Sequence, residues 1–299
     1  MKSDGSLATS EEERLEAWAE YQEKLGSRLE DPALDQRFAT EVEAKVSELA
    51  RLSPTLPASP LDGNFTKEEI KSAITRLKLG KASGADLVTN DMLKIGGDTM
   101  LKLLSRLFQW LNEAEVVPEQ WCHAIVTNIF KKGDPADPSN YRGISLISCL
   151  GKTYLSIWAA RLTTHMESQL SEDQGGFRPG RSTIDQVFTL HETLKERREQ
   201  KKESYLFFVD FRKAFDTVWH NGLWKRLWDC DVRGKLWRII RSLYRDTRLS
   251  VLVDGDMTRY VPVAQGVRQG CPLSPAQNVS TSIIFCRSCA ESAIITTSA

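Results

Sequence analysis

The feature that most constrains the fold of this chain is a continuous apolar run in its second half. Residues 204–211 read SYLFFVDF, without the alternation of polar and apolar side chains that marks a half-buried strand. A short run of this kind is typical of a strand that is buried on both faces and needs other elements to cover it. We therefore predict a buried strand here, with Asp210 at its end.

The surrounding sequence is patterned mainly for helices. Thr66 and Glu69 have the spacing of a capping box at the start of one of them. A strand that runs into a basic turn is predicted at 123–134, and Asp254-Gly255 predicts a hairpin between two strands. Helices interspersed with few strands indicate the α+β class. The predicted helices are two within 11–50, then Thr66–Leu77, one around 101–111, Cys149–Leu170, Ser182–Lys202, His220–Asp229 and Gly234–Asp246.

The N-terminal part differs in charge from the rest of the chain. Residues 1–52 hold 7 Lys and Arg against 13 Asp and Glu, whereas residues 53–299 hold 33 against 27. The formal net charge of zero therefore hides a mildly basic body, which is compatible with phosphate binding. We divide this part into an acidic helical segment at 1–52 and a Pro-rich linker at 53–64, where SPTLPASPLDG carries three prolines.

The sequence shows no membrane span and no secretory signal. It has no run of about 18 or more apolar residues, and its N-terminus lacks an apolar region. We expect an intracellular protein, in the nucleus or the cytoplasm, whose six cysteines are reduced. Cys286 and Cys289 have the spacing of half a zinc site, but no further ligand follows them, and we favour spare thiols.

Five sequence blocks occur along the chain. The central one is FFVDFRKAFDTV at 207–218, and the others are GKASGADLVTNDMLK at 80–94, KKGDPADPSNYRGISL at 131–146, QGGFRPGRSTIDQ at 174–186 and AQGVRQGCPLSP at 264–275. Their content and order resemble the reverse transcriptases of non-LTR, LINE-type retroelements. A group II intron or retron enzyme is the alternative within the family, although NYRGISL is more similar to the LINE type.

The resemblance implies nucleotidyl transfer by two metal ions. Asp210 stands where the family has a strand-end Asp that holds a divalent metal, expected to be Mg²⁺. Phe215 stands where an aromatic ring lies under the sugar of the incoming nucleotide and favours deoxynucleotides. Asp216 is either a partial helper or the cap of the following helix, and we favour the cap. The chain contains no Asp-Asp dipeptide, so the second carboxylate motif of the family is missing.

The same resemblance implies contacts to nucleotide and nucleic acid. Lys131 or Lys132, together with Arg142, matches positions that contact the triphosphate, and the arginine fork suits bidentate phosphate binding. Gln269 and Gly270 match the centre of a motif that supports the template base and the nucleotide, where glycine permits a close approach. The residues matched to a block associated with template contact are Phe177, Arg178, Arg181 and Ser182.

The implied fold is the fingers and part of the palm of a right-hand polymerase. Fingers would cover 65–203 and a partial palm 204–277, while 278–299 resembles nothing in the family. The implied function is DNA synthesis from an RNA template, a DNA primer and dNTPs. We expect this chain to be inactive because the second carboxylate motif is missing. The alternatives are a non-catalytic nucleic-acid-binding remnant, and a scaffold protein that uses the acidic helices without nucleic acid.

Two aromatic patterns have alternative interpretations. RSLYRDTRLSVLV, at 241–253, could grip nucleic acid through Arg and Tyr side chains, or it could form a solvated basic helix face with Tyr244 in the core. Trp224, Trp228 and Trp237 occur at helical spacings, and for them we favour core positions over base stacking.

Overall fold

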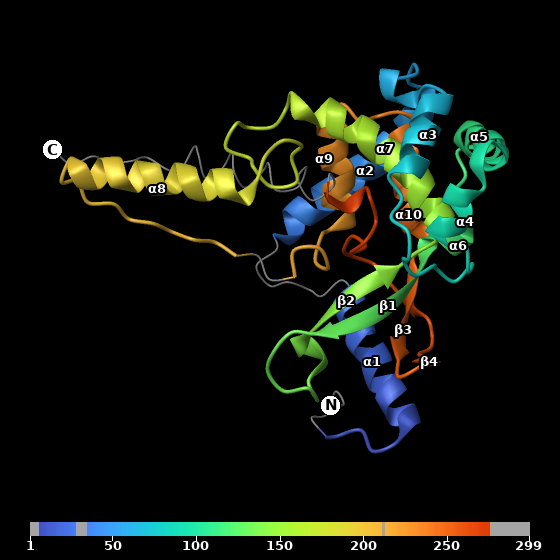
Figure 1. The fold of residues 1–299 in the computed structure, drawn as a ribbon, viewed down its shortest axis with the longest axis horizontal. Coiled ribbons are helices and arrows are strands. Elements are labelled where there is room, and N and C mark those ends of the chain that lie inside the picture. Colours follow the sequence, from blue (N-terminus) through green and yellow to red (C-terminus); the bar gives the residue numbers. More distant parts are fainter. Residues whose placement is uncertain (1–5, 28–34, 211–212, 276–299) are drawn as a thin grey trace.

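The structure, a computed structural model, describes residues 6–27, 35–210 and 213–275. Helices form most of it, and a small mixed sheet lies beside them (Figure 1). This architecture confirms the α+β class. The helix α8, Thr183–Glu199, extends away from the rest of the molecule (Figure 1).

The sheet has five strands and is built around β1. Antiparallel β2 lies on one side of β1, and parallel β3 lies on the other, followed by β4. The predicted hairpin is confirmed, because β3 and β4 are joined by Asp254 and Gly255, which both have positive φ angles of 53° and 106°. The strands are β1 His123–Phe130, β2 Tyr141–Leu146, β3 Arg248–Val253, β4 Asp256–Met257 and β5 Val261–Pro262, which also pairs with β3.

The helices predicted from the sequence are present, with small shifts at most of their ends. The capping box is formed, because Glu69 N donates to Thr66 Oγ1 over 3.1 Å and Thr66 N donates to Glu69 Oε2 over 2.8 Å. The remaining α-helices are α1 Glu11–Gly26, α2 Gln36–Leu52, α3 Lys67–Thr75, α4 Asn90–Ile95, α5 Gly97–Ala114, α6 Glu119–Cys122, α7 Cys149–Glu167, α9 His220–Asp229 and α10 Lys235–Arg245. Short 3-10 turns are η1 Ser53–Thr55, η2 Pro60–Asp62 and η3 Pro138–Asn140.

The core lies between the helices and contains most of the tryptophan rings discussed above. Trp224 and Trp237 are buried, and Trp228 packs edge to face on Trp237 with 5.3 Å between the ring centroids. Tyr244 is also buried. Trp224, Trp237 and Tyr244 are therefore core residues and Trp228 packs against the core, which favours the core interpretation over base stacking.

The Pro-rich segment at 53–64, which we predicted to be a linker, packs against the body of the molecule. Asp62 is buried, and its Oδ1 accepts a hydrogen bond from Leu236 N at the start of α10 over 3.1 Å. Ser53 is completely buried, and its carbonyl oxygen accepts from Arg238 Nη1 over 2.8 Å. Prolines begin the two 3-10 turns of this segment. The hydrogen bonds of Asp62 and Ser53 show that the segment is folded onto α10.

The predicted strand at 204–211 is wrong. Residues 204–210 have no regular secondary structure and are exposed, with Tyr205 91% and Phe207 92% accessible, while 211 and 212 lie outside the described residues. The segment does not lie beside the Asp254-Gly255 hairpin either, because the neighbours of β3 are β1, β4 and β5. A strand needs a hydrogen-bonding neighbour, and none of the described strands pairs with this segment. The predicted tail at 278–299 also lies outside the described residues.

Candidate functional site

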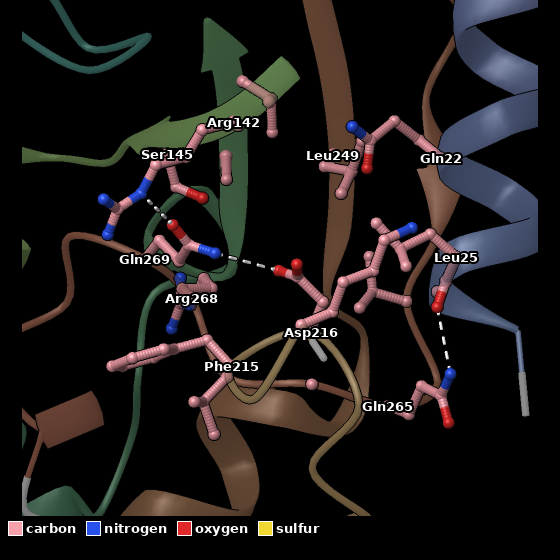
Figure 2. A pocket seen from close by; sticks show the side chains of 18 of the residues that line it. Gln22, Leu25, Arg142, Ser145, Phe215, Asp216, Leu249, Gln265, Arg268 and Gln269 are labelled. Atoms are coloured by element: carbon pink, nitrogen blue, oxygen red, sulfur yellow. Dashed lines mark hydrogen bonds between the residues drawn. The ribbon is translucent and has the colours of Figure 1, made fainter. Parts of the chain in front are cut away.

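A cavity of about 260 Å³ opens where the small sheet meets α1 and the turn that follows residue 212. Its walls come from α1, β1, β2, the turn at 213–216, β3 and the loop at 263–269. Figure 2 shows side chains from these elements pointing toward one another around Asp216. Segments that are far apart in the sequence therefore form one site.

Backbone hydrogen bonds hold the loop at 263–269 against two other walls of this cavity. Ser145 N in β2 donates to Gln269 O over 3.0 Å, and Val267 N donates to Phe215 O over 2.6 Å. Gly266 has a φ of 86°, and a Cβ there would lie 2.6 Å from the carbonyl oxygen of Asp216. Only glycine fits this position, because both the backbone conformation and the space exclude a side chain.

Gly270 is required for a related reason. Its φ is 115°, and a Cβ would lie 2.9 Å from the carbonyl oxygen of Ser145. This close approach is to the backbone of β2, and the predicted approach of Gly270 to a base pair stays a prediction. Gly270 follows the lining residue Gln269 and is not itself among the residues that line the cavity.

A chain of hydrogen bonds crosses the cavity. Arg142 Nε donates to Gln269 Oε1 over 3.2 Å, and Gln269 Nε2 donates to Asp216 Oδ1 over 3.2 Å (Figure 2). Burial raises the pKa of the Asp216 carboxyl, while the hydrogen bond from Gln269 and the nearby charges of Lys213, Lys131 and Arg142 oppose that rise. Gln269 thus links a cation on β2 to a carboxyl on the opposite wall.

The cavity carries an excess of positive charge. Its charged lining residues are the cations Lys131, Arg142, Lys213 and Arg268 and the single carboxylate Asp216. Four cations around one carboxylate favour a ligand with several negative charges, and Arg and Lys together are the usual protein ligands of phosphate groups. The arrangement is therefore suited to a polyphosphate.

Phe215 adds an apolar surface at the same place. It lines the cavity, and its ring meets the ring of Phe177 edge to face with 6.0 Å between centroids. Phe177 belongs to a different predicted block and is 59% exposed. The structure therefore brings an aromatic residue of the template block next to the aromatic residue of the first palm motif.

The other residues of the template block stabilise their own loop. Arg178 is buried, donating to Glu167 Oε1 over 2.9 Å and to Ser171 O over 2.8 Å. Arg181 forms an ion pair with Glu172. Ser182 caps α8, because its Oγ accepts from Asp185 N over 3.2 Å. Template contacts by these residues stay predictions.

The structure brings together Lys131, Arg142, Phe215 and Gln269 and leaves other predicted residues outside the cavity. Lys132 and Asp210 are not among its lining residues, and Asp210 is exposed. In the described parts of the chain, no three His, Cys, Asp or Glu side chains come together as metal ligands. Among the described residues that line the cavity, Asp216 is the one carboxylate that could hold a divalent metal ion.

Some lining residues were missed or undervalued by the sequence interpretation. Asp216 does not cap the next helix, since α9 begins at His220 and its N-cap position is Trp219. Lys213 lies in the same sequence block and had no assigned role. The contribution of α1 had no sequence signal, because its acidic and amphipathic pattern says nothing about where the helix docks.

The sequence over residues 129–286, more than half of the chain, matches the family described as "Reverse transcriptase (RNA-dependent DNA polymerase)". The chain belongs to the reverse transcriptase family. Polymerases of this family use an RNA template, nucleotides and, in general, a divalent metal ion. In the described part of this reverse transcriptase chain, no helix is long and apolar enough to cross a membrane.

Relatives from retrotransposons match most of this reverse transcriptase chain. It is 31% identical to "Probable RNA-directed DNA polymerase from transposon BS" of Drosophila melanogaster over 91% of the chain, and 31% identical to "RNA-directed DNA polymerase from mobile element jockey" of the same species over 86%. It is 32% identical over 71% to "Retrovirus-related Pol polyprotein from type-1 retrotransposable element R2" of Popillia japonica. These are non-LTR elements, as predicted. The chain spans only 29%, 28% and 29% of these three relatives.

Proposed function

We propose that the cavity binds the incoming dNTP of a reverse transcriptase that copies the RNA of a non-LTR element from a DNA primer, with Mg²⁺ as its metal ion. The observation that carries the proposal is the ratio of charges on the cavity walls, four cations to one carboxylate. A triphosphate supplies the opposite charge in a compact form. Family membership supports the same ligand class.

Different lining residues would contact different parts of such a nucleotide. Arg142 and Lys131 lie on and just beyond the β1–β2 pair, where they would contact the triphosphate. Gln269 accepts from Arg142 Nε and so restricts the orientation of that guanidinium. Phe215 offers the flat apolar face for the sugar.

Binding and catalysis are separable in this chain. The described residues gather no set of three metal-ligating side chains, and Asp210 is exposed away from the cavity lining. In-line transfer of a nucleotide needs charge stabilisation at both the attacking and the leaving oxygen. We therefore propose that the 299-residue polypeptide binds dNTPs but does not extend a primer.

Nucleotide binding is tested by titrating a fluorescent dATP analogue into the purified chain and displacing it with dATP. Arg142→Gln should weaken dATP binding by about tenfold, because it removes a charged phosphate ligand. Arg106→Gln is the matched control, since Arg106 is exposed on α5 and does not line the cavity. Equal affinities for all three proteins would contradict the proposal.

The lack of catalysis is tested by primer extension on a primed RNA template with dNTPs and Mg²⁺. We expect no extension by the chain or by an Asp210→Asn variant. Extension by the parent that disappears in the variant would show that a second carboxylate is recruited from elsewhere. Against the scaffold alternative, two acidic side chains of α1, Glu16 and Glu23, are already paired with Arg259 of the same chain.

A further inference from the structure

We infer that the N-terminal helix α1 is part of the nucleotide site, with Tyr21 positioning Lys213 so that its ammonium group binds a phosphate of the nucleotide. The inference rests on the proposed dNTP binding and adds to it two residues and one helix. Tyr21 and Lys213 line the cavity together, although they are separated by 192 positions in the sequence.

The helix α1 is fixed to the loop that forms the cavity wall. At its C-terminal end, Leu25 O accepts a hydrogen bond from Gln265 Nε2 over 3.0 Å (Figure 2). Gly26 O accepts a second one from Ala264 N over 2.8 Å. The last carbonyl groups of a helix lack partners within the helix, so these bonds satisfy them and set the position of the helix end. The end of α1 and the loop at 263–269 therefore form a single wall.

The outer side of α1 is held by charge pairs. Arg259 lies 3.1 Å from Glu16 and 2.6 Å from Glu23, and Arg14 lies 3.1 Å from Asp254 of the hairpin. Glu16 and Glu23 thus face a partner outside the cavity. The residues that α1 contributes to the cavity are uncharged: Tyr21, Gln22, Leu25 and Gly26. A Glu-rich helix can therefore form this wall without reducing the positive charge inside.

The contact between α1 and Lys213 has two components. Lys213 Nζ donates to Tyr21 Oη over 3.0 Å, and the ammonium nitrogen lies 5.1 Å from the centroid of the same ring. An ammonium group has three donors, so the Tyr21 hydroxyl fixes its direction and leaves two donors for a ligand. The charge of Lys213 also acts on Asp216 in the cavity. The ammonium group of Lys213 therefore lies at the charged cavity, close enough to act on Asp216.

The backbone at Lys213 is held in an unusual conformation. Its φ is 51°, in the left-handed region that a residue with a long side chain rarely adopts. The turn is stabilised by Asp216 N and Thr217 N, which both donate to Lys213 O, over 2.8 and 3.1 Å. Lys213 therefore leaves the turn in a defined direction, toward Tyr21.

The test is a double-mutant cycle on the full chain, with dATP affinity as the measurement. Lys213→Gln should weaken dATP binding by about tenfold, as expected for a charged phosphate contact, and should leave deoxyadenosine binding unchanged. Tyr21→Phe keeps the ring and removes only the hydroxyl, and it should weaken dATP binding by about threefold. In the Lys213→Gln background the same change should have no further effect, because the pair acts as a unit.

Glu12→Gln is the control on the same helix, because Glu12 is exposed and does not line the cavity. It should leave dATP affinity unchanged, and thermal unfolding should show that each variant is folded. Additive effects of the two substitutions, or an unchanged affinity of Lys213→Gln, would overturn the inference. If the parent chain binds dATP and responds to Arg142→Gln while Lys213→Gln has no effect, this inference fails and the proposed function stands.

Discussion

Replacing Arg161 with alanine should strongly destabilise the chain, because this side chain ties α7 to the segment that precedes α3. Its Nε and Nη2 donate to the two carboxylate oxygens of Glu69 over 2.7 and 2.8 Å. Its remaining N–H groups donate to backbone oxygens, namely Leu61 O over 2.9 Å, Gly63 O over 2.6 Å and Asn64 O over 2.9 Å. One guanidinium group thus fixes both the capping-box residue Glu69 of α3 and the backbone of the segment that precedes this helix.

The magnitude follows from these contacts and from their exposure. The side chains of Arg161 and Glu69 are 15% and 30% exposed, so solvent screens the pair only partly. The guanidinium also lies over the rings of Phe65 and Trp158, at 4.9 and 5.4 Å from their centroids. Hydrogen bonds to charged groups are each worth about 1.5–3 kcal/mol, but they are not additive. A loss of about 3–4 kcal/mol in the free energy of unfolding is expected for the set.

Urea unfolding followed by circular dichroism measures this loss. Arg37→Ala is the control, since its ion pair with Glu41 is exposed at 88% and 64% and should contribute less than about 0.5 kcal/mol. Arg161→Lys should fall between the two, because an ammonium group cannot make the fork. A loss below about 1 kcal/mol for Arg161→Ala, or one equal to that of Arg37→Ala, would refute the argument.

Three further predictions concern the site and its surroundings. Burial raises the pKa of Asp216 above its ordinary 3.8, so Asp216→Asn should stabilise the fold at neutral pH. This gain in the free energy of unfolding should disappear below pH 3.8, where the carboxyl is protonated in both the folded and the unfolded chain. Urea unfolding at several pH values measures the gain, and a gain that is independent of pH would contradict the prediction. Phe207→Glu should reduce self-association in light scattering without lowering the thermal midpoint, because Phe207 is 92% exposed; unchanged scattering would contradict it. Phe215→Ala should reduce the preference for dATP over ATP in binding competition, and an unchanged ratio would show that its ring does not contact the sugar.

Local features of the fold were predictable from the sequence because neighbouring residues encode them. The capping box at Thr66 and Glu69, the turn at Asp254-Gly255 and the helix α9 depend on contacts within a few residues. The apolar run at 204–210 shows the limit of this reasoning. Hydrophobicity predicts that a segment can be buried, but burial also requires a partner, and pairing is a property of the whole fold.

The sequence also predicted part of the candidate site. Sequence blocks identified Arg142, Phe215 and Gln269, and the structure places all three around one cavity. Periodicity identified α1 as a helix but could not show that Tyr21 reaches Lys213, because docking depends on contacts made between residues far apart in the chain. The blocks also did not show that the segment holding Asp210 would lie outside the cavity lining.

The central claim, that this cavity is the nucleotide site of a reverse transcriptase, is tested most directly by photo-crosslinking with an azido analogue of dATP and mapping the labelled peptides. The account predicts labels within 141–146, 213–217 or 263–269, lost with excess dATP and reduced in Arg142→Gln. Labels confined to α5, or labels that persist unchanged in the presence of excess dATP and in the variant, would contradict it.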